Sequence, residues 1–108
     1  MLLVLSSPFF GPQTELIVEE ATRNHLPAMY IFRRYAELGG LMSYGADNVA
    51  MLRQAAAYVA KVLRGAKPAD LPVEQTNRFE FVINLKTAKA IGVELPTSIL
   101  LRAEEVIE

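Results

Sequence analysis

The sequence predicts an α/β fold in which a parallel sheet lies between helices, giving the domain three layers. Short, continuous apolar runs such as residues 2–5 are typical of strands that are covered on both faces. In the first half of the chain, apolar runs alternate with helical patterns three times. Strands that alternate with helices form parallel sheets, and this alternation therefore sets the fold class.

The first half of the chain contains three expected strands, over residues 2–5, 26–32 and 41–44. A short helix follows the first strand, with Thr14 as its expected N-cap. A shorter helix over residues 33–38 is stopped by two consecutive glycines. Together these elements build the amino-terminal part of the sheet.

The most clearly patterned element is a helix that begins after Asp47 and ends at Gly65. Asp47 is a suitable N-cap, glycine commonly ends a helix, and Pro68 prevents its continuation. Apolar residues fall at helical spacing on one side, namely Leu52, Ala55, Ala56, Val59, Val62 and Leu63. The alanines predict close packing against a sheet or another helix.

The second half of the chain predicts one strand and two helices. An extended connector over residues 67–77 leads to a strand over residues 79–83. Asn84 is placed to cap a helix over residues 85–91, which Gly92 ends. A final helix is expected after Pro96, with a buried side made of Ile99, Leu100, Leu101, Ala103 and Val106.

Composition excludes several functional classes. A length of 108 residues suits one domain with a modest core. The net charge of -1 and the pI near 5.8 provide no electrostatic footprint for nucleic acid. The chain lacks cysteine, which excludes disulfides and thiolate metal sites. No apolar run approaches the ~20 residues of a membrane-spanning helix.

The sequence offers no catalytic constellation. It contains no nucleophile elbow, and its single histidine, His25, lies in a turn away from the expected strand ends. One histidine also argues against a catalytic zinc site. We therefore expect no enzymatic activity, no metal and no cofactor.

The candidate site consists of the loops at the carboxyl ends of the predicted strands, which converge on one edge of a parallel sheet. These loops carry Ser7 and Phe9, then Arg33, then Ser43 and Tyr44. Hydroxyls, aromatic rings and a guanidinium suit a small polar or zwitterionic ligand, because arginine pairs with carboxylates through two hydrogen bonds. The residues alone leave a structural alternative open, in which the aromatic rings are core, the arginine is solvated and Ser43 bonds to the backbone.

Several stretches together resemble a known family: GGLMSYG at residues 39–45, KVLRGAKPADLPVEQ at residues 61–75, FEFVINLKTAKAIG at residues 79–92, and the closing residues 95–108. Combined, they resemble the carboxyl-terminal part of periplasmic substrate-binding proteins of ABC transporters, in the group of tryptophan/tyrosine-type binding components. Where members often have an acidic residue before the proline of the first loop, this chain has Ser7.

The resemblance implies a two-lobe protein of the type I-like periplasmic-binding fold, of which this chain is roughly the final third. Residues 1–44 would belong to the second lobe, residues 45–72 would return toward the first lobe, and residues 73–108 would form the last crossing and the final helices. The missing first lobe and export signal are expected outside this chain. The resemblance further implies a periplasmic location, an ABC permease as the parent protein's partner, and a small ligand such as an aromatic or branched amino acid.

Two other hypotheses are open. A self-associating structural fragment would use the exposed helix face that includes Ala55, Ala56, Val59 and Leu63 to form a homodimer. A flavodoxin-like regulatory domain ranks last, because it requires acidic residues in the strand-end loops and those loops contain none.

Overall fold

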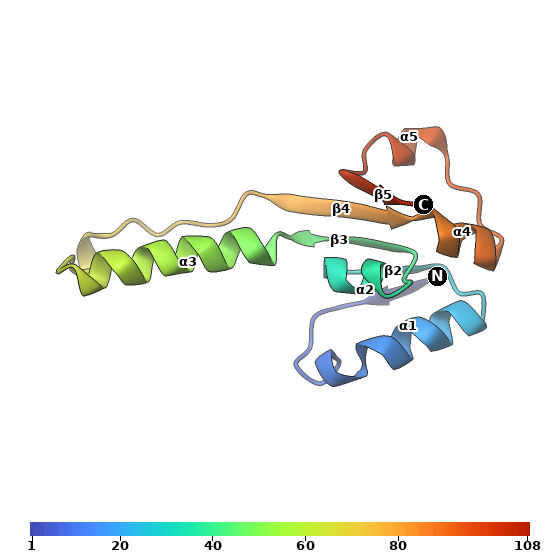
Figure 1. Cartoon of the computed structure of the whole chain (residues 1–108), viewed down its shortest axis with the longest axis horizontal. Helices are drawn as coiled ribbons and strands as arrows, with labels where there is room; N and C mark the ends of the chain where they lie inside the picture. The colour runs from blue at the N-terminus through green and yellow to red at the C-terminus, as the bar shows by residue number, and fades with distance from the viewer. The chain divides into compact units, whose positions relative to one another are not determined.

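The computed structural model describes residues 1–108, which form two compact units. Unit 1 comprises Met1–Gly45 together with Glu80–Glu108, and unit 2 comprises Ala46–Phe79. The chain passes from unit 1 into unit 2 and back again (Figure 1).

The elements largely follow the predicted order. The strands are β1 (Leu2–Val4), β2 (Ala28–Tyr30), β3 (Met42–Ala46), β4 (Phe79–Asn84) and β5 (Glu105–Ile107). The helices are α1 (Thr14–Arg23), α2 (Arg33–Glu37), α3 (Asn48–Leu63), α4 (Leu85–Ile91) and α5 (Thr97–Leu100). No helix is both long enough and apolar enough to cross a membrane.

The sheet has five strands in the order β1-β2-β3-β4-β5. β1 pairs with β2, β2 with β3, and β4 with β5, all in parallel. The Asn84 N–H, at the end of β4, donates to the carbonyl of Leu41, just before β3 begins, at 2.8 Å. β4 therefore runs antiparallel to β3. The predicted α/β class is confirmed, but the sheet is mostly and not wholly parallel, because β4 and β5 run against β1, β2 and β3.

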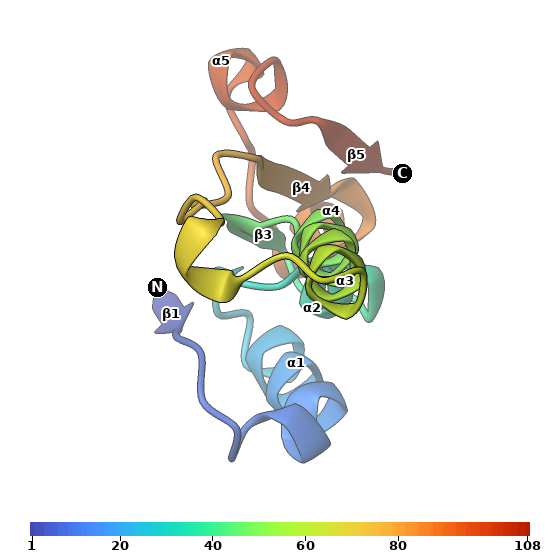
Figure 2. The same cartoon turned by 90° about the vertical axis from the view of Figure 1, so that its left-hand side faces the viewer.

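Helices cover both faces of the sheet in unit 1. Ala28 and Tyr30 of β2 join a core cluster with Val18 of α1, whereas the intervening Met29 packs on a second cluster that includes Ile83. The residues around α5 pack against that second cluster. Figure 2 shows α1 and α5 on opposite sides of the strands. The sheet is therefore the middle of three layers, as the sequence predicts.

The glycines of the stretch at residues 39–45 allow close approaches. A Cβ at Gly40 would lie 2.6 Å from the ring of Tyr30 and 2.8 Å from the carbonyl oxygen of Tyr35. A Cβ at Gly45 would lie 2.0 Å from the carbonyl oxygen of Ile31. Only a residue without a side chain fits these two positions.

Unit 2 consists of α3 and the segment that returns along it (Figure 1). The Asp47 carboxylate accepts the Ala50 N–H at 2.9 Å, so the predicted N-cap is confirmed. The Tyr58 hydroxyl donates to the carbonyl of Pro72, and Gln54 donates to Glu74. These bonds fasten the returning segment to one side of the helix.

The other side of α3 is uncovered. No residue of α3 is buried, so the predicted packing of its alanines against a sheet or another helix is not found. Exposed apolar residues alternate at spacings of three and four along the uncovered side: Val49, Leu52, Ala56, Val59 and Leu63. We call these five residues the open face. Leu52 is 71% exposed and Leu63 is 82% exposed.

The carboxyl-terminal residues depart from prediction. The expected final helix ends at Leu100, and Val106 lies in β5. The Glu104 N–H donates to the carbonyl of Phe81 at 2.9 Å, where β5 joins β4. Pairing with an available neighbouring strand thus overrides the local helical pattern.

Candidate functional site

The predicted site residues lie at the edge of unit 1 where β1, β2 and β3 end. These strands are parallel, so the loop that carries Ser7 and Phe9, the turn that carries Arg33, and the end of β3 share this edge. We call it the strand-end edge. The structure therefore places the predicted elements together, although the five side chains have different surroundings.

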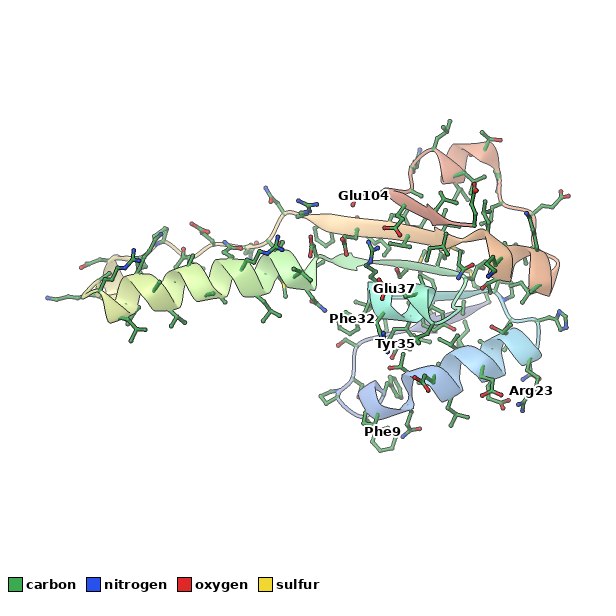
Figure 3. All side chains as sticks on the ribbon, in the orientation of Figure 1. Phe9, Arg23, Phe32, Tyr35, Glu37 and Glu104 are labelled. Carbon is green, nitrogen blue, oxygen red and sulfur yellow. The ribbon has the colours of Figure 1, made fainter.

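Ser7 and Phe9 are held in one loop. The Phe9 N–H donates to the Ser7 hydroxyl oxygen at 3.3 Å. Phe9 is 72% exposed, and its ring meets the ring of Phe10 edge-on, with centroids 6.3 Å apart. Figure 3 shows Phe9 directed outward near the start of α1. An exposed aromatic ring on a short loop can pack against the apolar part of a ligand.

Ser43 and Tyr44 are neighbours in β3 and therefore project from opposite faces. Tyr44 is half exposed, and its ring meets the ring of Phe81 edge-on, with centroids 6.1 Å apart. Ser43 is only 1% exposed, and its hydroxyl oxygen is buried without a hydrogen-bond partner. Tyr44 thus stands at the surface, whereas Ser43 lies in the core of unit 1, and its role in ligand binding stays a prediction.

Arg33 is engaged by carboxylates. Its guanidinium lies 2.7 Å from Glu37, 2.6 Å from Glu105 and 3.8 Å from Glu80. Hydrogen bonds to Glu37 and Glu105 raise the pKa of Arg33, so the side chain is cationic at any physiological pH. Figure 3 shows Glu37 on α2, where it lies one turn beyond Arg33.

Sequence reasoning missed the acidic residues at the strand-end edge. Because β4 is antiparallel to β3 and β5 is parallel to β4, the beginnings of β4 and β5 share the edge where β3 ends. Glu80, Phe81 and Glu105 reach it from there. The strand-end loops named from the sequence contain no acidic residue, so these carboxylates come to the edge only through the pairing of β4 and β5. The alternation of apolar and charged residues in Phe79-Glu80-Phe81 predicted a strand, but it did not indicate in which direction that strand runs.

Three hollows of the surface are lined by residues other than the five predicted ones. Two depressions of unit 1 share Leu38, Gly39 and Thr87, at the edge opposite the strand-end edge. In unit 2, an apolar groove between α3 and the returning segment is lined by Met51, Tyr58 and Leu71, among others. No group of three or more side chains is arranged to hold a metal ion.

Comparison with known proteins identifies the kind of chain to which these units belong. Residues 8–107 match the family described as ABC transporter substrate binding protein. A conserved domain protein from Vibrio cholerae O1 biovar El Tor is 27% identical, with a TM-score of 0.88 over 97% of this chain and 36% of that one. No curated protein matches.

Two further solved structures are similar. The ABC domain from Streptococcus pneumoniae, in complex with L-Trp, is 30% identical, with a TM-score of 0.85 and coverage of 97% of this chain and 36% of that one. The ligand-free, open structure of CD0873, a substrate binding protein with adhesive properties from Clostridium difficile, is 19% identical. Its TM-score of 0.63, over 99% of this chain and 36% of that one, supports the fold alone. The present chain spans about a third of the length of these structures.

Proposed function

The chain belongs to the family of ABC transporter substrate-binding proteins, and from this premise we propose that it contributes one lobe, and a piece of a second, to a solute-binding protein. The single observation that carries the proposal is the family match over residues 8–107. Coverage of about a third of each similar structure supports the view that unit 1 works together with polypeptide beyond these residues. The family serves transport, and we assign the chain no catalytic step.

The uncovered side of α3 supports the lobe assignment. A helix of 16 residues that buries none of them lacks the packing from which most helices in proteins derive their stability. We infer that α3 belongs to the first lobe and that the remainder of that lobe covers its open face in the complete protein. Unit 1, with its own sheet and core, corresponds to the second lobe.

We propose a small amino-acid-like ligand, bound between lobes at the strand-end edge. The similarity to a domain that carries L-Trp supports an aromatic or branched amino acid. Exposed Phe9 and half-exposed Tyr44 supply aromatic surface there, and the Ser7 hydroxyl lies beside Phe9. Arg33 and Ser43 are the other two contacts predicted from the sequence; Arg33 is paired with carboxylates, and Ser43 is buried. The same premise implies an ABC permease as partner and a periplasmic location.

The test is a titration of the isotope-labelled chain with L-tryptophan, followed by amide chemical shifts. Because one lobe provides only part of a cleft, we expect weak binding, with shifts confined to the residues of the strand-end edge. Phe9→Ala and Tyr44→Ala should each weaken these shifts, whereas Leu101→Ala, at an 81% exposed position, should not. Shifts spread evenly over the surface, or unchanged in both aromatic variants, would contradict the proposal.

A second candidate is self-association through the open face. Its alternating spacings of three and four form the kind of apolar seam that pairs two helices. Light scattering over a concentration series should then reveal a dimer that the double variant Leu52→Lys/Val59→Lys dissociates. Leu101→Lys adds one positive charge at an exposed position outside the open face and should leave the mass unchanged. A monomer at every concentration would eliminate this candidate.

A further inference from the structure

The carboxylates around Arg33 come from three different elements of unit 1. Nε of Arg33 faces Glu37 of α2 at 2.7 Å, Nη2 faces Glu105 of β5 at 2.6 Å, and Nη1 faces Glu80 of β4 at 3.8 Å. Each of the three guanidinium nitrogens thus has its own carboxylate. The pair with Glu105 joins positions 72 residues apart in the chain.

The two strand carboxylates lie on the face of the sheet that α2 covers. Val82 is the register partner of Glu105, and Glu80 stands two residues before Val82, so both glutamates project from the same face. Asn84, two residues further along β4, donates its side-chain N–H to the carbonyl of Ala36 in α2 at 3.0 Å. The Arg33 contacts and the Asn84 contact therefore attach α2 to β4 at two points.

The charge balance of the cluster argues against a further anion. Three carboxylates and one guanidinium leave a formal charge of -2 on Arg33, Glu37, Glu80 and Glu105. A ligand carboxylate at Arg33 would be the fourth around a single cation, and like charges repel at this range. The planar guanidinium presents its five N–H groups as a fork, which suits it to hold several fixed acceptors at once.

We propose that Arg33 is a positioning residue that holds the start of α2 against β4 and β5 and thereby fixes the loop after β2 at the strand-end edge. The ligand's carboxylate is then bound by groups other than Arg33. That the fixed loop forms part of a ligand site rests on the proposed function. That Arg33 holds α2 against β4 and β5 does not.

The first test compares Arg33→Met with Arg34→Met in the full chain without ligand. Arg34 is the matched control because it is the next residue of α2, is exposed and forms no ion pair. Hydrogen exchange at the amides of residues 35–40 should become about tenfold faster in Arg33→Met and change by less than about twofold in Arg34→Met. Equal exchange in the two variants would overturn the proposal.

A second readout separates charge from packing. The charged groups that face Arg33 are Glu37, Glu80 and Glu105, on α2, β4 and β5. Replacing Glu80 and Glu105 by Gln in the Arg33→Met background should recover part of the exchange protection. A loss of protection that the two Gln substitutions do not rescue contradicts the proposal.

Two controls keep the result interpretable. If Arg33→Met fails to fold, Arg33→Lys retains the charge without the fork, and exchange intermediate between wild type and unfolded chain supports the proposal. Because exchange is measured without ligand, failure of the proposed ligand role leaves this result intact. If Arg33→Met shows normal exchange but loses the amide shifts caused by L-tryptophan, Arg33 does not position α2, and it contacts the ligand directly.

Discussion

The two units achieve order in different ways. Unit 1 buries two apolar clusters, one on each face of its sheet, and Val82 and Ile83 are completely inaccessible. Unit 2 buries no apolar residue, and Asp47 is its only buried side chain. α3 is nevertheless the longest helix of the chain. A strong helical pattern thus identifies a helix without identifying what it packs against.

Burial of a side chain in a core requires contacts between segments that are distant in the sequence. Formation of a capped helix rich in alanine, leucine and valine depends mainly on neighbouring residues. Isolated helices of about this length are marginal in water. We therefore expect unit 1 to dominate the free energy of unfolding, and α3 to depend on its cap, on the returning segment, and on whatever covers the open face. The following predictions test this difference.

The largest effect should come from the core of unit 1. Ile83→Ala removes a completely buried side chain that packs with Leu41 and Ala88, and it should lower the free energy of unfolding by about 2–5 kcal/mol. Urea denaturation measures this. Leu52→Ala in the open face should change stability by less than about 0.5 kcal/mol, because its side chain is 71% exposed. A comparable cost for the two variants would show that the open face is covered in solution.

A somewhat smaller loss should follow from Gly45→Ala. The new Cβ would meet the Ile31 carbonyl oxygen at 2.0 Å, so the backbones of β2 and β3 would have to separate. Overpacking of this kind costs about 1–3 kcal/mol. The melting temperature measures the loss, and Gly11→Ala, with no atom within 4 Å of the new Cβ, is the control. Equal melting temperatures for the two variants would disprove the close approach.

A local effect of about 1 kcal/mol should follow from Asp47→Ala, which removes the N-cap of α3 and the ion pair with Arg78 at 3.1 Å. Amide exchange should accelerate in the first turn of α3 and remain unchanged at residues 82–84 of β4. Asn48→Ala, one position later in the chain, should have little effect. Equal acceleration in both regions would mean that the two units unfold together and are not stabilised independently.

The smallest effect should come from Arg23→Ala at the end of α1. Arg23 pairs with Glu19 at 2.9 Å and with Glu20 at 2.6 Å, but these side chains are largely exposed (Figure 3). Exposed pairs contribute less than about 1 kcal/mol, and salt screens them. The difference from wild type should therefore disappear at high salt in urea denaturation. A difference that persists would indicate that Arg23 packs on unit 1 through its aliphatic stem.

The candidate site was predictable to the level of elements but not of side chains. Three parallel strands brought the loops of Ser7, Arg33 and Tyr44 to one edge, because direction and handedness follow from strand-helix alternation. The acidic partners of Arg33 were missed because they depend on the reversed direction of β4 and on the strand character of residues 105–107. Both features are settled by pairing between distant segments.

Capping, apolar periodicity and family-typical stretches are local features, so the α/β class, the helix caps at Asp47 and Asn84, and the family could be predicted from the residues alone. The folded chain was needed to learn that Ser43 is buried while Tyr44 is not, that α3 has an open face, and that Arg33 meets three carboxylates. These outcomes depend on which segments lie beside one another. Burial and ion pairing depend on which residues are neighbours in space, and those neighbours are often far apart in the sequence.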